Sequence, residues 1–373
     1  VGTMGSLLTP DQREAYVSEV REEYEGLRER RSRRGAKSEL LSLEEARNRA
    51  FRTDWAAYDP PEPASPGIHE LTASVAQLRE IVDWTPFLAA WELKGKYPDV
   101  LEDDSEVGEQ ARSLLDDAGA LLDRIEADGI LEPRGVVGLF PAAAVGDDVH
   151  LYPDQDRNEV LATIHGLRQQ FGKEGRDNLC LADYVAPEGS GVTDWAGAFA
   201  VTSGRGLDDY IAEREAAHDD YQAILAKSVA DRLAEAMAEW AHQEVRTRLW
   251  GYAPREALSR EDLAAEAYRG IRPAPGYPAC PDHTEKRTLF RLLDAEERVG
   301  MHLTESYAMD PPASVSGWYF AHSSARYFGV GRLGRDQVQD YAARKGMEVA
   351  EVERWLAQSL GYEPSDDEPR EER

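Results

Sequence analysis

The proline-rich stretch at residues 272–281, RPAPGYPACP, constrains the fold of this chain more than any other segment. Three prolines fall within six of its residues, and each fixes φ and removes a backbone donor. The segment therefore cannot form a helix interior or a central strand, and we expect an extended, pre-ordered loop. Arg272 opens the loop, Gly276 allows close approach to its backbone, and Tyr277 follows. This combination suits a small zwitterion that carries a flat ring; a purely structural proline loop is the alternative.

Composition limits the class of protein. The chain has 373 residues, 42% of them hydrophobic, and a formal net charge of −28. Such an acidic balance argues against nucleic-acid binding, which requires a basic surface, and no apolar run is long enough to cross a membrane. The start, VGTM, shows no signal-peptide pattern, and two cysteines cannot build a disulfide framework. We therefore expect a cytoplasmic protein.

Helical patterns occur in five places. A charged arm spans residues 8–51, and an amphipathic helix carries apolar residues between 114 and 125 and ends near Gly129. A long helix has its apolar side between residues 221 and 240. Two short helices, 336–345 and 349–360, are each followed by a glycine.

Strand patterns lie between these helices. Residues 136–140 and 149–152 flank the turn signal Gly-Asp-Asp at 146–148 and predict a pair of strands. Further strands are predicted at 179–185 and 196–202, and a hairpin is predicted from 314–320 and 326–330. Strands and helices without regular alternation indicate an α+β fold. We predict a twisted antiparallel sheet flanked by helices, with an N-terminal helical linker arm.

The arm contains the only dense basic cluster, between Arg28 and Lys37. A solvated linker is the preferred interpretation, and a docking patch for an acidic partner such as a flavoprotein is the alternative. Four prolines between residues 60 and 66 follow as a semi-rigid spacer. No Rossmann glycine fingerprint, phosphate loop or serine-nucleophile elbow is present. Cys280 and His283 form a lone C-x-x-H pair, too few ligands for zinc, so no metal site is predicted.

Several segments carry a resemblance to a known family, and they occur in the family's order from about Ser6 to Tyr362. The chain resembles the C-terminal reactivation domain of cobalamin-dependent methionine synthase, which binds S-adenosylmethionine. Besides residues 272–286, the segments that carry the resemblance are IVDWTPF at 81–87, PRGVVGLFP at 133–141, DRLAEA at 231–236, ASVSGWYF at 313–320 and VERWL at 352–356.

The resemblance implies a division of the chain and a function. Residues 1–67 would be a helical linker from a preceding cobalamin-binding domain, residues 68–363 the S-adenosylmethionine-binding activation domain, and residues 364–373 a disordered acidic tail. In that family a flavodoxin-type donor reduces inactive cob(II)alamin, and S-adenosylmethionine methylates it to methylcobalamin. The chain lacks the family's Asp-x-His-x-x-Gly cobalamin motif, so a partner domain would hold the corrinoid. The activity implied is that of a methyltransferase component of methionine biosynthesis, with no acid–base catalyst in this chain.

The resemblance also implies which residues contact S-adenosylmethionine. Two of them have an equally plain structural interpretation, because Asp83 suits a helix cap and Phe328 suits a core aromatic in a strand. Glu235 alone would be part of a solvated helix face, together with Arg232, Glu239 and His242. The full set implied by the resemblance is Asp83, Glu235, Arg272, Ala274, Gly276, Tyr277, Tyr327 and Phe328.

Two other functions stay open on the sequence. The chain could be a stand-alone corrinoid reactivation protein that acts in trans. It could also be a docking or S-adenosylmethionine-binding module that does not support methyl transfer.

Overall fold

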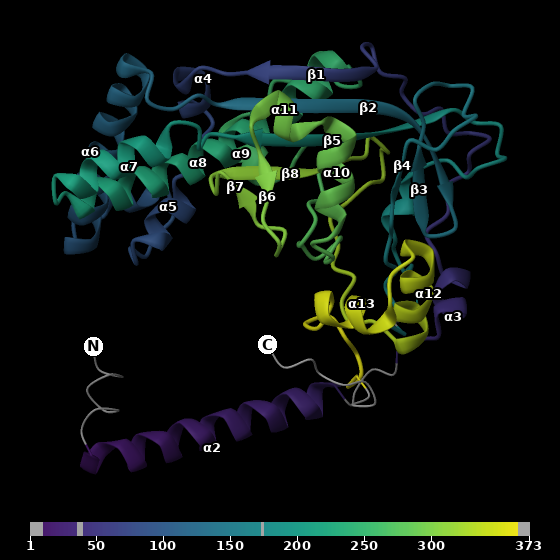
Figure 1. Cartoon of the computed structure of the whole chain (residues 1–373), viewed down its shortest axis with the longest axis horizontal. Helices are drawn as coiled ribbons and strands as arrows, with labels where there is room; N and C mark the ends of the chain where they lie inside the picture. Colours follow the sequence, from purple (N-terminus) through teal and green to yellow (C-terminus); the bar gives the residue numbers. More distant parts are fainter. Residues whose placement is uncertain (1–9, 36–39, 173–174, 365–373) are drawn as a thin grey trace.

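A six-stranded antiparallel sheet lies at the centre of the structure, which is a computed structural model (Figure 1). The long strand β2 (Arg134–Val145) organises it, since β1 (Gly67–Thr72), β3 (Asp148–Leu151) and β5 (Asp194–Thr202) all pair with β2. Strand β4 (Ala162–Ile164) pairs with β3, and β8 (Ser314–Tyr319) pairs with β5. The short strands β6 (His302–Leu303) and β7 (Met309–Asp310) form a separate pair.

The structure describes residues 10–35, 40–172 and 175–364, without side chains at 10–12, 23 and 27–35. The predicted basic cluster and the acidic tail from residue 365 therefore lie outside the described side chains. Among the described residues, no helix is both long and apolar enough to cross a membrane.

The sheet is covered on both faces because its central strands are apolar on both sides. Along β2, Val137 and Leu139 belong to one core cluster, whereas Val136 and Phe140 belong to another. Successive side chains of a strand point to opposite faces, so each face receives its own layer of helices. The predicted α+β fold, with an antiparallel sheet flanked by helices, is confirmed.

The first face packs against a group of helices around α8 (Asp220–Glu244). The second face packs against α10 (Glu285–Leu293) and α11 (Ala295–Val299). The other helices of the first group are α4 (Val75–Arg79), α5 (Thr85–Ala90), α6 (Glu106–Asp128) and α7 (Leu207–Ala216). Short helical turns η1 (Asp99–Glu102) and α9 (Arg260–Ala264) lie in the connections. As predicted, α6 ends at Gly129 in the left-handed conformation.

The predicted strand at 179–185 is wrong, because a 3-10 turn, η2 (Leu181–Tyr184), occupies it. The Asp183 carboxylate accepts a hydrogen bond from the backbone nitrogen of Cys180 at 2.9 Å. The same carboxylate pairs with the buried Arg168 guanidinium at 2.7 Å. This local capping turns the chain at Cys180 and competes with an extended conformation.

The predicted hairpin of 314–320 with 326–330 is also wrong. Strand β8 forms, but its outer edge is taken by the proline strip, the name used here for residues 271–281. Ile271 and Phe320 exchange backbone hydrogen bonds of 3.0 and 3.1 Å, and the Trp318 nitrogen donates to the Pro273 carbonyl at 2.9 Å. Residues 326–330 therefore cross the far side of the strip, where the Val330 nitrogen donates to the Pro278 carbonyl at 2.8 Å.

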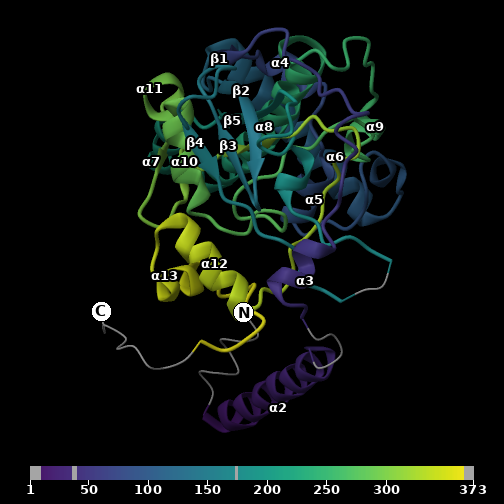
Figure 2. The same ribbon diagram turned by 90° about the vertical axis from the view of Figure 1, so that its right-hand side faces the viewer.

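The N-terminal arm contains α2 (Pro10–Gly35) and α3 (Leu43–Asn48). Helix α3 lies beside α12 (Arg335–Lys345) in both views (Figures 1 and 2), and Arg47 pairs with Asp340 at 2.9 Å. The proline-rich spacer packs against the end of α8, where the Trp250 indole donates to the Pro61 carbonyl at 2.7 Å.

The C-terminal helices α12 and α13 (Val349–Trp355) have a small core of their own and join the body through buried charges. Helix α13 ends five residues earlier than predicted. The Lys345 ammonium lies 2.6 Å from Asp282 and 2.7 Å from Glu285, and all three side chains are almost fully buried. One ammonium thus pairs with two buried carboxylates.

Replacing this cation should destabilise the fold strongly. Lys345→Met leaves Asp282 and Glu285 without their cation in a dry site, and we expect a loss of about 3–5 kcal/mol in the free energy of unfolding. Arg79→Ala is the control, because Arg79 pairs with Asp123 on the surface and its loss should cost less than about 1 kcal/mol. Urea unfolding of both variants measures the difference, and equal losses would contradict the dependence on Lys345.

Candidate functional site

The candidate site forms where the C-terminal half of α8 faces the proline strip. Glu239 and His242 point from α8 into the protein and are 8% and 0% exposed. The expectation that both belong to a solvated face is therefore wrong. Helix α8 packs on β5 and β8, and the strip lies along the outer edge of β8, so the helix and the strip meet over the sheet.

Arg272 links the two elements. Its Nη1 lies 2.5 Å from Glu239 Oε2, 3.4 Å from His242 Nδ1 and 3.4 Å from the Tyr268 hydroxyl. Burial lowers the pKa of Arg272, but the charge of Glu239 outweighs it and the pKa is raised overall. Its Nε and Nη2 donate to no protein group among the described residues. Glu239 therefore holds one edge of the guanidinium, and the other three N–H groups have no protein partner within the described part of the chain.

A second ion pair holds Glu239 from behind. Helix α8 continues into a π-turn, η3 (Val245–Leu249), which contains the fully buried Arg246. Arg246 lies 3.5 Å from Glu239 and 2.7 Å from Glu256, and its guanidinium stacks over the Tyr268 ring at 4.4 Å. The two carboxylates and two guanidinium groups form a balanced, buried network, so the orientation of Arg272 is fixed by the protein itself.

Aromatic rings surround this network. The His242 ring stacks on Tyr319 with centroids 5.1 Å apart and meets Tyr268 edge-on at 4.9 Å. The Arg272 backbone nitrogen donates to the Tyr327 hydroxyl at 3.0 Å, and the Tyr327 ring is 36% exposed. The predicted site residues Arg272 and Tyr327 are thus in direct contact.

The strip turns sharply between Ala274 and Cys280. The Tyr277 nitrogen donates to the Ala274 carbonyl at 3.1 Å, and the Gly276 nitrogen donates to the Cys280 carbonyl at 2.7 Å. Gly276 has φ +98°, and a Cβ there would lie 2.3 Å from the His283 ring. The close approach predicted at Gly276 is therefore made by His283, which makes glycine necessary at this position.

Glu235 and Tyr277 lie near each other at the outer side of the strip. Partial burial raises the pKa of Tyr277, and the negative charge of Glu235 raises it further. Tyr277 is 60% exposed, and Glu235 lies one helical turn before Glu239 on the same face of α8. An exposed ring and an exposed carboxylate thus lie near each other where α8 meets the strip.

Two other predicted site residues, Asp83 and Phe328, have partners within the protein. Asp83 Oδ1 accepts a hydrogen bond from the Thr85 nitrogen at 2.9 Å, at the start of α5. Phe328 is partly buried against two core clusters and lies 6.5 Å from the Tyr184 ring. No hydrogen bond, ion pair or ring contact within the described part of the chain joins Asp83 or Phe328 to the strip, and their ligand contacts stay predictions.

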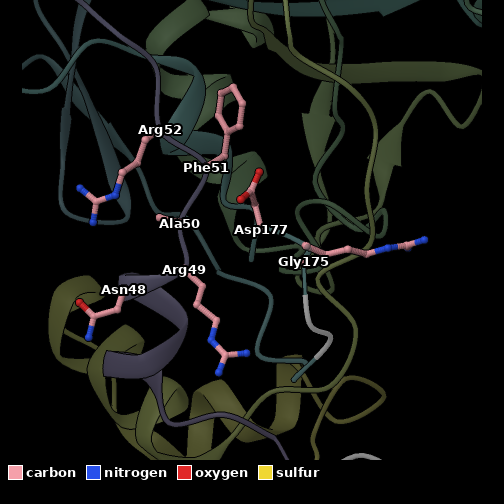
Figure 3. A pocket seen from close by; sticks show the side chains of 8 residues that line it. Asn48, Arg49, Ala50, Phe51, Arg52, Gly175 and Asp177 are labelled. Carbon is pink, nitrogen blue, oxygen red and sulfur yellow. The ribbon is translucent and has the colours of Figure 1, made fainter.

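An open cavity of about 720 Å³ lies elsewhere, between α3 and the segment after residue 174 (Figure 3). The arginines among its lining residues donate no hydrogen bond to a carboxylate of the described residues. Figure 3 shows the guanidinium groups of Arg49 and Arg52 pointing apart. None of the predicted ligand residues lines this cavity, which Asn48, Arg49, Ala50, Phe51, Arg52, Gly175, Arg176 and Asp177 form.

The residues that sequence reasoning missed are the partners of Arg272. Glu239, His242 and Arg246 are buried around it although all three are titratable, and Tyr268 is half-buried beside them. One signal was available, because residues 233–241 read LAEAMAEWA and have small or apolar residues on every side of the helix. A helix of this kind is buried, so a carboxylate at 239 needs an internal cation.

His242 should make stability depend on pH. Burial lowers its pKa well below the ordinary value, and the charges of Arg246 and Arg272 lower it further. The folded protein therefore keeps His242 neutral, whereas the unfolded chain binds a proton near pH 6.5. The free energy of unfolding is therefore highest above that pH. It decreases as the pH falls, because the unfolded chain gains a proton at His242 that the folded protein does not bind.

His242→Gln should make the loss of stability between pH 7 and pH 5 shallower, by up to about 1.4 kcal/mol per pH unit. Guanidinium unfolding at pH 5, 6 and 7 measures the slope. His302→Gln, at a half-exposed histidine, should keep the wild-type slope. Parallel curves for the wild type and His242→Gln would rule out a neutral, buried His242.

Comparisons with known proteins show the family of this chain. A family model described as "Vitamin B12 dependent methionine synthase, activation domain" matches residues 74–346. Among solved structures, the chain is similar to the crystal structure of the MetH reactivation domain bound to AdoHcy, with 55% sequence identity and a TM-score of 0.85. That likeness covers 87% of this chain and 99% of the other. The resemblance seen in the sequence is confirmed, and the chain belongs to the family of activation domains of vitamin B12-dependent methionine synthases.

Proposed function

We propose that this chain binds S-adenosylmethionine between α8 and the proline strip and presents its methyl group to a corrinoid held by a partner domain. The observation that carries the proposal is Arg272. Glu239 fixes one edge of its guanidinium, and the opposite edge has no protein partner among the described residues. A planar pair of N–H groups that has no protein partner matches the two oxygens of a carboxylate. The similar solved structure contains AdoHcy, which carries the same carboxylate.

The remaining ligand groups have complementary partners. The carboxylates of Glu235 and Asp83 are exposed and suit the α-ammonium. The ring of Tyr277 is exposed beside Glu235 and suits the sulfonium, because a cation is attracted to an aromatic face. The backbone of Ala274, Gly276 and Phe328 and the hydroxyl of Tyr327 complete the proposed contacts.

The chain's part in the reaction is to bind and orient the methyl donor. The overall reaction is the reductive methylation of inactive cob(II)alamin to methylcobalamin, which reactivates methionine synthase within methionine biosynthesis. The corrinoid supplies the nucleophile when its domain docks. Transfer of a methyl group by direct displacement needs no general base, so positioning and exclusion of water are the contributions expected of Arg272, Glu235 and Tyr277.

We place the partners and the domain limits as follows. Residues 1–67 link a preceding cobalamin-binding domain to the activation domain at 68–363 of a cytoplasmic protein, and the predicted acidic tail lies, from residue 365 on, outside the described residues. A flavodoxin-type donor supplies the electron.

Arg49, Arg52 and Arg176 border the open cavity without a hydrogen-bonded carboxylate among the described residues. This arrangement suits docking of an extended acidic surface, such as that of the electron donor, rather than binding of a single anion. A protein acting in trans, or a binding module without methyl transfer, is the second candidate.

Arg272→Lys should weaken AdoHcy binding while keeping the fold. Lysine keeps a cation beside Glu239 but loses the fork that faces the ligand. We expect a loss of about 1.5–3 kcal/mol in binding free energy, the range for a charge-assisted hydrogen bond, measured by calorimetry. Arg298→Lys is the matched control, because Arg298 pairs with Glu70 on the surface. Unchanged affinity in Arg272→Lys would remove Arg272 from the site.

Methyl transfer should depend on the partner domain. Mixed with cob(II)alamin, a reductant and S-adenosylmethionine, the chain alone should form methylcobalamin poorly, and adding the cobalamin-binding domain should restore the reaction. Holding both reactants in one site can lower the barrier by roughly 7–11 kcal/mol. The visible spectrum of the corrinoid follows the product. Equal rates in both mixtures would favour the protein acting in trans.

A further inference from the structure

Residues 51–58 of the linker form an aromatic cluster against His322, three residues after β8. The Tyr58 ring stacks on the His322 ring with centroids 4.3 Å apart, and Trp55 meets both rings edge-on at 5.6 Å. The Ser324 nitrogen donates to His322 Nδ1 at 3.1 Å, so Nε2–H of a neutral His322 donates to the Thr53 hydroxyl at 3.0 Å. The linker is thereby seated on one defined loop of the body.

The Tyr58 hydroxyl joins this loop to a second segment. Its oxygen accepts hydrogen bonds from the Ser323 nitrogen at 3.1 Å and from Arg269 Nη2 at 3.0 Å. Arg269 Nε in turn donates to the Ala321 carbonyl at 2.9 Å. One phenol oxygen therefore ties the segment that leads into the proline strip to the segment that follows β8.

These two segments meet again in the candidate site. Ile271 pairs with Phe320, and the Arg272 nitrogen donates to the Tyr327 hydroxyl. Along the chain, Arg269 precedes Arg272 by three residues and Ser323 precedes Tyr327 by four. The two segments that run from Tyr58 to the site are short and are hydrogen-bonded to each other at both ends. A displacement of Tyr58 should therefore move Arg272 and Tyr327, because few backbone torsions lie between them.

We propose that Tyr58 is a positioning residue. When residues 51–58 of the linker pack against the loop after β8, the contacts of Tyr58 set the distance between Arg272 and Tyr327, and this distance determines the affinity for the ligand. The inference rests on the proposed function. It makes the affinity for the ligand sensitive to the position of the linker, because displacement of residues 51–58 would release both site segments together. Thermodynamic reciprocity requires the converse, that ligand binding tightens the seating of the linker.

Tyr58→Phe tests this, because phenylalanine keeps the stacking on His322 and removes the shared acceptor. We expect the Kd for AdoHcy, measured by calorimetry on the full chain, to rise roughly 3- to 30-fold. The control is Tyr362→Phe, which removes a hydroxyl bonded to Glu353 at the C-terminal end and should leave the Kd unchanged. Trp55→Phe carries the same expectation if Tyr58→Phe fails to fold.

A second readout separates positioning from general destabilisation. AdoHcy should slow hydrogen exchange at the amides of Ala57 and Tyr58, which bond to the Asp54 carbonyl, and Tyr58→Phe should reduce that slowing. Equal AdoHcy affinity in the wild type and Tyr58→Phe would overturn the inference and leave the proposed function standing. Exchange at these amides that does not respond to AdoHcy in the wild type would also overturn it. A wild type that does not bind AdoHcy would instead refute the proposed function.

Discussion

The buried pair of Glu239 and Arg272 is the interaction on which the site depends. A guanidinium that is mostly buried is stabilised by a carboxylate beside it, and a buried carboxylate on α8 needs a cation. The pair, at 2.5 Å, therefore fixes both the strip and the helix over the sheet. Arg246 and Glu256 complete the network, so the protein's own groups hold Arg272 in one orientation.

The proline strip adds rigidity of a different kind. Its prolines restrict the backbone before any ligand arrives, and its pairing with β8 and with Val330 holds it from two sides. A surface ordered in advance loses less entropy on binding. In the proposed complex, the ligand has only to satisfy the open edge of Arg272 and the exposed groups of the strip and α8. The same support on two sides is the basis of the proposed coupling, in which the contacts of Tyr58 affect the position of Arg272 through few intervening residues.

Much of the fold follows from local patterns in the sequence. The apolar runs in β2 and β5, the Gly-Asp-Asp turn and the apolar side of α8 all predicted elements that are present. The hairpin after β8 could not be predicted, because its strand competed with the proline strip for the same sheet edge and local pattern carries no information about that competition. The prediction of a strand at 179–185 was wrong for a similar reason, because Asp183 pairs with Arg168, which is 15 residues away in sequence.

The site was predicted in part. Arg272, Tyr327, Tyr277 and Glu235 lie together around the strip, and the family resemblance, rather than residue pattern, selected them. Glu239 and His242 were assigned to solvent because charge on a helix usually indicates an exposed face. Their burial depends on partners, Arg272 and Arg246, that tertiary packing brings to them.

The central claim is that the outer edge of Arg272 receives the carboxylate of the ligand. The most direct test compares S-adenosylmethionine with 5′-methylthioadenosine, which keeps the adenosine and lacks the amino-acid part, by calorimetry on the wild-type chain and on Arg272→Lys. If Arg272 contacts the carboxylate, the wild type should prefer S-adenosylmethionine strongly, and the preference should fall about tenfold or more in the variant. The same preference in both proteins would contradict the account, because the carboxylate would then be bound somewhere other than Arg272.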